Sequence, residues 1–120
     1  MQVPPERVIN VKDRPVAYLI DCLPVNLLSE KDLEQGFNGS VLDLLLKRGE
    51  PALSNSYTEI GSVPAPTNVA KCLEIQRGDV LMFFKANLYD DIGNVVDYST
   101  SYFIPGYFRF HVVRRVEALL

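Results

Sequence analysis

Short turns join several strand-like segments of this chain, and they limit how the strands can pair. Two hairpins are expected. In the first, the turn 12–15 joins strands 8–11 and 16–22. In the second, the turn 90–94 joins strands 80–89 and 95–103. Turns this short connect antiparallel neighbours, because a parallel pair needs a crossover of about a dozen residues or more. A strand–helix–strand pattern does not recur along the chain. We therefore expect an antiparallel sheet.

Two short helices are expected after the first hairpin. Ser29 and Ser40 are each followed three positions later by an aspartate, as is typical of helix starts, and Gly36 and Gly49 mark the two helix ends. The helix after Ser40 is rich in leucine on more than one face. This pattern predicts a helix that packs against the sheet.

A third helix and two further strands complete the expected order. Residues 53–63 and 108–115 read as strands, the latter because its apolar side chains alternate. Thr67 is expected to cap a helix at 68–73 that turns four side chains inward: Val69, Ala70, Cys72 and Leu73. The predicted fold class is α+β, an antiparallel sheet with helices packed on one side.

The composition fits one folded domain that spans residues 1–120. Hydrophobic residues make up 48% of the chain, enough for a core. Two cysteines, Cys22 and Cys72, are too few for a disulfide framework, so a reducing cytoplasm is the expected location. A net charge of −3 argues against an autonomous nucleic-acid binder, and no apolar run approaches the roughly 20 residues of a membrane span.

Residues that would indicate catalysis or a metal are sparse in this sequence. His111 is the single histidine, and the two cysteines are too far apart in sequence to suggest a zinc site. Glycine-rich phosphate loops and the serine elbow of hydrolases do not occur. We expect neither an enzyme nor a metal or cofactor.

The two hairpins resemble each other in sequence. Pro15-Val16-Ala17-Tyr18 aligns with Val95-Val96-Asp97-Tyr98, and a proline follows each strand. Unrelated antiparallel hairpins also look alike, so duplication and coincidence both remain open. If the halves are related, the first lacks the helix that precedes the second. The start of the chain is then expected to be truncated.

Several short motifs follow one another in order along nearly the whole chain. They are Arg14-Pro15-Val16-Ala17-Tyr18, Gly39-Ser40-Val41-Leu42-Asp43-Leu44-Leu45, Gly78-Asp79-Val80-Leu81 and Val95-Val96-Asp97-Tyr98-Ser99. Each motif alone is weak, but together they are fairly specific. With them the chain resembles the UTRA domain, the effector-binding domain of HutC-type regulators in the GntR superfamily.

The resemblance implies a fold like that of chorismate lyase. It also implies a small-molecule effector, a homodimer, and DNA contacts made only through an N-terminal winged-helix domain that is absent here. No membrane partner is implied. By family position, Arg7, Ser40 and Asp97 are effector-binding residues, and Arg7 with Ser40 could hold an anionic group.

Three further candidate residues come from the strand pattern. Ser99 shares a strand face with Asp97 and Ser101, because alternate residues point the same way. Tyr18 and Tyr102 are expected to be core aromatics whose hydroxyl groups find a partner at the site. Other charged positions of the family are replaced here by apolar residues or glycine: Ile9, Leu19, Ile104 and Gly106. The predicted effector is therefore a small polar molecule that can be anionic, bound differently from a sugar phosphate.

The favoured interpretation is the ligand-sensing and dimerising domain of a bacterial transcription repressor. Two alternatives remain. A pure oligomerisation module would have no enclosed pocket, and a lyase of the same fold would need a charged pocket with a positioned acid.

Overall fold

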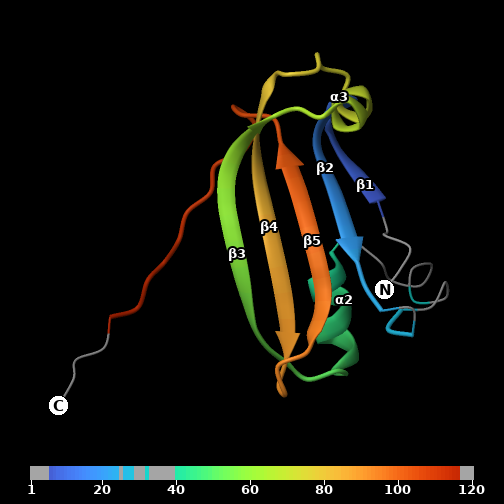
Figure 1. The fold of residues 1–120 in the computed structure, drawn as a ribbon, viewed down its shortest axis with the longest axis vertical. Coiled ribbons are helices and arrows are strands. Elements are labelled where there is room, and N and C mark those ends of the chain that lie inside the picture. The colour runs from blue at the N-terminus through green and yellow to red at the C-terminus, as the bar shows by residue number, and fades with distance from the viewer. Residues whose placement is uncertain (1–5, 25, 29–31, 33–39, 117–120) are drawn as a thin grey trace.

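A computed structural model of the chain describes residues 6–24, 26–28, 32 and 40–116. Five strands form one antiparallel sheet in the order β1-β2-β5-β4-β3 (Figure 1). The strands are β1 (Glu6–Val11), β2 (Arg14–Cys22), β3 (Leu53–Pro64), β4 (Val80–Asp90) and β5 (Val95–Phe103). Two helices accompany them, α2 (Val41–Arg48) and α3 (Thr67–Leu73). The predicted α+β class and both hairpins are confirmed.

The two hairpin turns follow from local chemistry. Val11 pairs with Arg14, so Lys12 and Asp13 form a two-residue turn, and both have positive φ angles of 48° and 65°. That combination suits the twist of a hairpin. In the second turn, the Asp90 carboxylate accepts hydrogen bonds from the backbone amides of Ile92 and Asn94. Burial opposes ionisation of Asp90, but these hydrogen bonds outweigh it and lower the pKa of the carboxyl group.

Helix α2 has the capping residues that its sequence predicts. The Asp43 amide donates to Ser40 Oγ at 3.1 Å, and Gly49 ends the helix with a φ of 78°. Helix α3 starts differently from the prediction. Its N-cap is Pro66, without a side-chain hydrogen bond, so Thr67 lies inside the helix rather than capping it. The helix expected at residues 29–36 lies outside the described residues, apart from Asp32.

These two helix starts lead to a paired prediction. Ser40→Ala should lower the free energy of unfolding by about 1 kcal/mol, because the Asp43 amide loses its acceptor. Thr67→Ala is the matched control and should change it by less than about 0.5 kcal/mol, since Thr67 makes no capping bond. Urea denaturation of the three proteins measures both values. Equal losses in the two variants would contradict the capping assignment.

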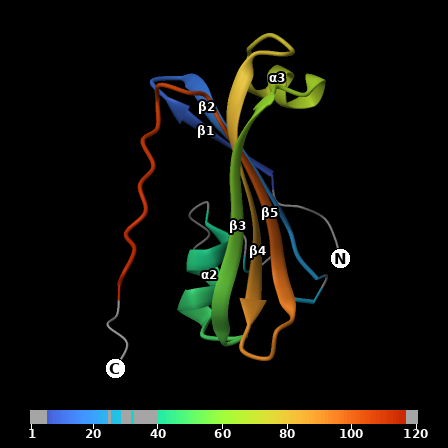
Figure 2. The ribbon, with the colours of Figure 1, turned by 60° about the vertical axis from the view of Figure 1, so that its left-hand side comes forward.

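The two helices lie on opposite faces of the sheet, which corrects the expectation that they share one side (Figure 2). Helix α3 packs with Tyr18 and Leu81, whereas α2 packs with Leu23 and Leu88. Tyr18 and Leu23 are an odd number of residues apart on one extended segment. Leu81 and Leu88 on β4 are also an odd number of residues apart. Alternation along a strand therefore points the members of each pair to different faces.

One inward assignment in α3 also fails. Cys72 is exposed, while Leu73 is fully buried. Val69, Ala70 and Leu73 form the buried stripe of this short helix. Cys72 directly precedes Leu73, and successive residues are about 100° apart around a helix, so Cys72 turns to solvent.

No helix among the described residues combines the length and the apolar character that crossing a membrane would need.

The strand expected at residues 108–115 does not form within the described chain. The chain instead turns at Pro105 and Gly106 and continues without pairing with a strand of the sheet. Phe108 and Phe110 pack their rings against Phe103, with centroid distances of 4.8 Å each. The alternating apolar residues thus mark packing onto the face of the sheet rather than pairing along its edge.

Candidate ligand-binding site

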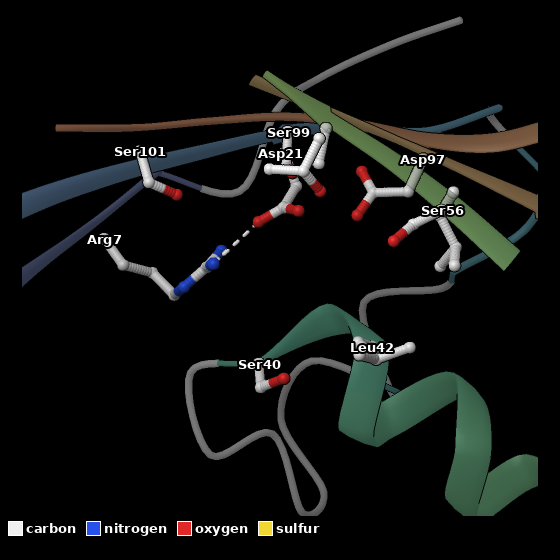
Figure 3. A pocket seen from close by; sticks show the side chains of 11 residues that line it. Arg7, Asp21, Ser40, Leu42, Ser56, Asp97, Ser99 and Ser101 are labelled. Carbon is white, nitrogen blue, oxygen red and sulfur yellow. Dashed lines mark hydrogen bonds and ion pairs between the residues drawn. The ribbon is translucent and has the colours of Figure 1, made fainter. Parts of the chain in front are cut away.

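A pocket of about 280 Å³ lies between the start of α2 and the face of the sheet that this helix covers (Figure 3). Its volume is close to the lower limit of about 300 Å³ for typical small-molecule sites. Five lining residues carry hydroxyl groups: Ser40, Ser56, Thr58, Ser99 and Ser101. Three are apolar: Leu42, Ala86 and Leu88. Arg7, Asp21 and Asp97 add ionisable groups to a wall that is otherwise uncharged.

Strand register explains why these side chains converge. Asp21 on β2 is opposite Ser99 on β5, and Ser99 is opposite Ala86 on β4. Thr58 on β3 continues the same row, because it is opposite Ala86. Directly paired residues share a sheet face, and residues two apart on one strand do so as well. The polar stripe at Asp97, Ser99 and Ser101 therefore lies along the pocket wall, as the strand pattern predicts.

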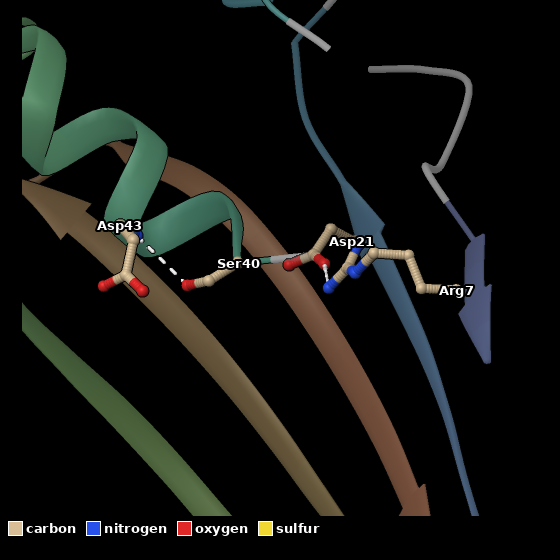
Figure 4. A network of polar contacts seen from close by, with 4 residues as sticks. All are labelled: Arg7, Asp21, Ser40 and Asp43. Atoms are coloured by element: carbon tan, nitrogen blue, oxygen red, sulfur yellow. Dashed lines mark hydrogen bonds and ion pairs between the residues drawn. The ribbon is translucent and has the colours of Figure 1, made fainter. Parts of the chain in front are cut away.

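A buried ion pair occupies one side of the pocket. Arg7 Nη2 lies 2.6 Å from Asp21 Oδ2, and their side chains are only 16% and 6% exposed. Figure 4 shows this pair beside Ser40, whose Oγ accepts from the Asp43 amide. The positive charge expected to hold an anion is thus already matched by a carboxylate that belongs to the protein.

Asp97 is the second buried carboxyl group of the pocket. Burial, together with hydrogen bonding to Asp21 and the negative charge of Asp21, raises its pKa to about 9. The Arg7 charge and the Cys22 backbone amide oppose these effects without cancelling them. Asp97 therefore keeps its proton at neutral pH.

A model of the UTRA domain family matches residues 5–109 of this chain. The chain belongs to the UTRA domain family. A search of curated proteins finds no match. The family assignment and the α+β fold agree with the resemblance that the sequence motifs indicate.

Solved structures with the same fold as this UTRA domain come from several bacteria. A GntR-family regulator from Enterococcus faecalis V583 is 23% identical, with a TM-score of 0.73, over 92% of this chain and 79% of that one. A putative transcriptional regulator from Streptomyces coelicolor is 26% identical, with a TM-score of 0.77, over 93% and 75%. The effector-binding domain of the Bacillus subtilis trehalose repressor is 16% identical, with a TM-score of 0.79, over 96% and 79%.

Four of the six residues predicted for the site of this UTRA domain line the pocket, and two do not. Arg7, Ser40, Asp97 and Ser99 line it, and their role in effector binding stays a prediction. Tyr18 and Tyr102 are placed elsewhere: both belong to the cluster beneath α3 on the opposite face of the sheet. Burial and a hydrogen bond to Glu6 raise the pKa of Tyr18 to about 12.

The sequence interpretation missed Asp21 and the β3 residues Ser56 and Thr58. Asp21 had a signal, since it is an acid within a strand that is otherwise almost entirely apolar. A charged residue in such a strand is rarely buried unless it has a partner. Ser56 and Thr58 had no comparable signal, because the polar sequence of β3 resembles that of any solvent-facing edge strand.

Among the described residues, no three metal-ligating side chains come together.

Proposed function

We propose that this UTRA domain is the effector-sensing and dimerising part of a bacterial regulator of the HutC type. A small molecule would bind in the pocket and change how an attached winged-helix domain engages DNA. Three features support this: the family membership, the fold shared with effector-binding domains, and above all the pocket itself. Such a regulator would act as a repressor in the cytoplasm.

The pocket is the observation on which the proposal rests. An oligomerisation module gains nothing from a cavity lined by a buried ion pair, a protonated carboxyl group and five hydroxyl groups. Buried charges usually lower stability relative to well-packed apolar side chains. Keeping them in the wall of a pocket fits a role in ligand recognition better than a role in folding.

A ligand screen with a blocked pocket tests this proposal. Small metabolites that bind the pocket should raise the unfolding midpoint of the wild-type protein. Ala86→Leu places a larger side chain in the pocket wall and should abolish these shifts. Lys85→Leu is the matched control, because it introduces the same side chain at the preceding position, on the other face of the sheet.

Two outcomes would favour the alternatives. Midpoint shifts that persist unchanged in Ala86→Leu, or no shifts across a chemically diverse library, would favour a pure oligomerisation module. Consumption of a bound compound during incubation with the protein would favour the lyase. Recovery of the unchanged compound is the result expected of a sensor.

Dimerisation is a separate prediction with its own structural support. Strand β3 is an edge of the sheet and is exposed along most of its length, and such edges are normally paired or covered. Beyond Phe110 the chain extends away from the sheet (Figure 1) and carries Val112 and Val113, which are 81% and 87% exposed. A second copy of the chain would cover these apolar side chains.

Light scattering at micromolar concentrations should give twice the 13.5 kDa mass of the chain. Replacing both Val112 and Val113 with aspartate should weaken the dimer about 100-fold, because burial of each valine contributes about 1.5 kcal/mol or more. Ile92→Asp is the control, since Ile92 is 78% exposed in the β4–β5 turn. Monomeric wild-type protein, or equal weakening in the control, would count against this interface.

A further inference from the structure

The described charged groups of the pocket leave no surplus of positive charge. Arg7 is paired with Asp21 inside the pocket, at 2.6 Å between nitrogen and oxygen. Asp97 adds a third ionisable group, and it is acidic. The three groups sum to zero charge while Asp97 keeps its proton, and to one negative charge once Asp97 ionises. An anionic ligand would therefore have to compete with Asp21 for Arg7, whereas a cationic ligand would not.

Asp97 also presents an acceptor that the described part of the protein leaves unused. The residue is 5% exposed, and no donor among the described residues reaches its Oδ1 atom. Figure 3 shows its carboxyl group pointing into the pocket, on the side of Asp21. Buried polar atoms nearly always have a hydrogen-bond partner, so an unmatched acceptor in a pocket wall marks the place where a ligand donor fits.

Hydroxyl groups from several elements line the same pocket as this acceptor. Ser99 and Ser101 extend from β5, Ser56 and Thr58 from β3, and Ser40 from the start of α2. A hydroxyl group can both donate and accept, which suits the hydroxyl groups of a polyol. The volume of about 280 Å³ restricts the ligand to a small molecule.

We propose that the pocket takes a small polyhydroxylated amine in its cationic form, with the ammonium group donating to Asp97 and the hydroxyl groups bonding to the surrounding serines and threonine. This inference rests on the proposed function, because it assigns the chemistry of the effector to the same pocket. It replaces the expectation of an anion held by Arg7 and Ser40.

Binding of such a ligand should release a proton. In the ligand-free protein Asp97 keeps its proton at neutral pH, because its pKa is raised to about 9. The ammonium group favours the carboxylate form, so the Asp97 proton passes to the buffer as the ammonium–carboxylate bond forms. The other ionisable groups that the described pocket wall places around Asp97 are Arg7 on β1 and Asp21 on β2. The lining residues of α2, β3 and β4 are uncharged.

Three molecules with one carbon skeleton separate charge from shape. Glucamine, sorbitol and gluconate share a six-carbon polyol chain and end in an ammonium, a hydroxymethyl and a carboxylate group. Calorimetry should show glucamine binding at least about tenfold more tightly than sorbitol, and gluconate more weakly than both. Repeating the glucamine titration in buffers of different ionisation enthalpy should reveal the released proton.

Asp97→Asn should remove both the preference for glucamine over sorbitol and the proton release. Asp91→Asn is the control, because it removes the same charge at an exposed position in the β4–β5 turn. Tightest binding of gluconate, equal binding of glucamine and sorbitol, or no binding of any of the three would overturn the inference. The proposed function would still stand if the Ala86-dependent screen finds a ligand of another chemistry.

Discussion

Replacing Arg7 with methionine is expected to lower the free energy of unfolding by about 3 kcal/mol at neutral pH. Methionine keeps much of the apolar length of arginine but removes the charge that pairs with Asp21. The Asp21 side chain is only 6% exposed, so it would remain buried without its cation and next to Asp97. Guanidinium denaturation of the purified domain measures the loss directly.

A second substitution separates the uncompensated charge from the loss of packing. Adding Asp21→Asn to Arg7→Met should recover most of the lost stability, because the double variant buries no unpaired charge at this position. Arg77→Met, in an exposed turn, should change the stability by less than about 0.5 kcal/mol. If the double variant is as unstable as Arg7→Met alone, the cost lies in packing, and the assignment to the ion pair is wrong.

Features set by neighbouring residues were predictable from the sequence. The turn at Lys12 and Asp13, the Ser40 cap and the alternation of Asp97 with Ser99 each depend on a few adjacent positions. Their geometry follows from backbone and side-chain preferences that operate over one turn or one strand. The N-cap of α3 is Pro66 instead of the predicted Thr67, because local preferences place a helix boundary only to within a residue or two.

Features that depend on the assembled sheet were not predictable in the same way. Alternation places Tyr18 and Asp21 on different faces, but it does not show which face α2 covers and therefore where the pocket lies. The pairing of Arg7 with Asp21 depends on the register between β1 and β2. The packing of Phe110 on the sheet likewise depends on Phe84, which lies on β4 and is distant from Phe110 in the sequence.

Asp97→Asn is expected to make the ligand-free domain more stable than the wild type as the pH rises. The ordinary pKa of this carboxyl group is 3.8, and burial in the folded domain raises it to about 9. Between pH 3.8 and about pH 9, the folded state therefore holds a proton that the unfolded chain has already lost. The stability that Asp97 contributes is complete below the unfolded value and is lost as the pH rises toward the folded one.

The size of this effect can be bounded from the proton difference. One proton bound only by the folded state changes the free energy of unfolding by at most about 1.4 kcal/mol per pH unit. Between about pH 5 and about pH 8 the ceiling is about 4 kcal/mol. Denaturation curves at the two pH values should show a small stability gain for the variant at the lower one and a larger gain at the higher one. Asp91→Asn should follow the wild type, because Asp91 is exposed. Parallel pH profiles for the wild type and Asp97→Asn would mean that Asp97 ionises normally in the folded domain, and a ligand cation would then have no proton to displace.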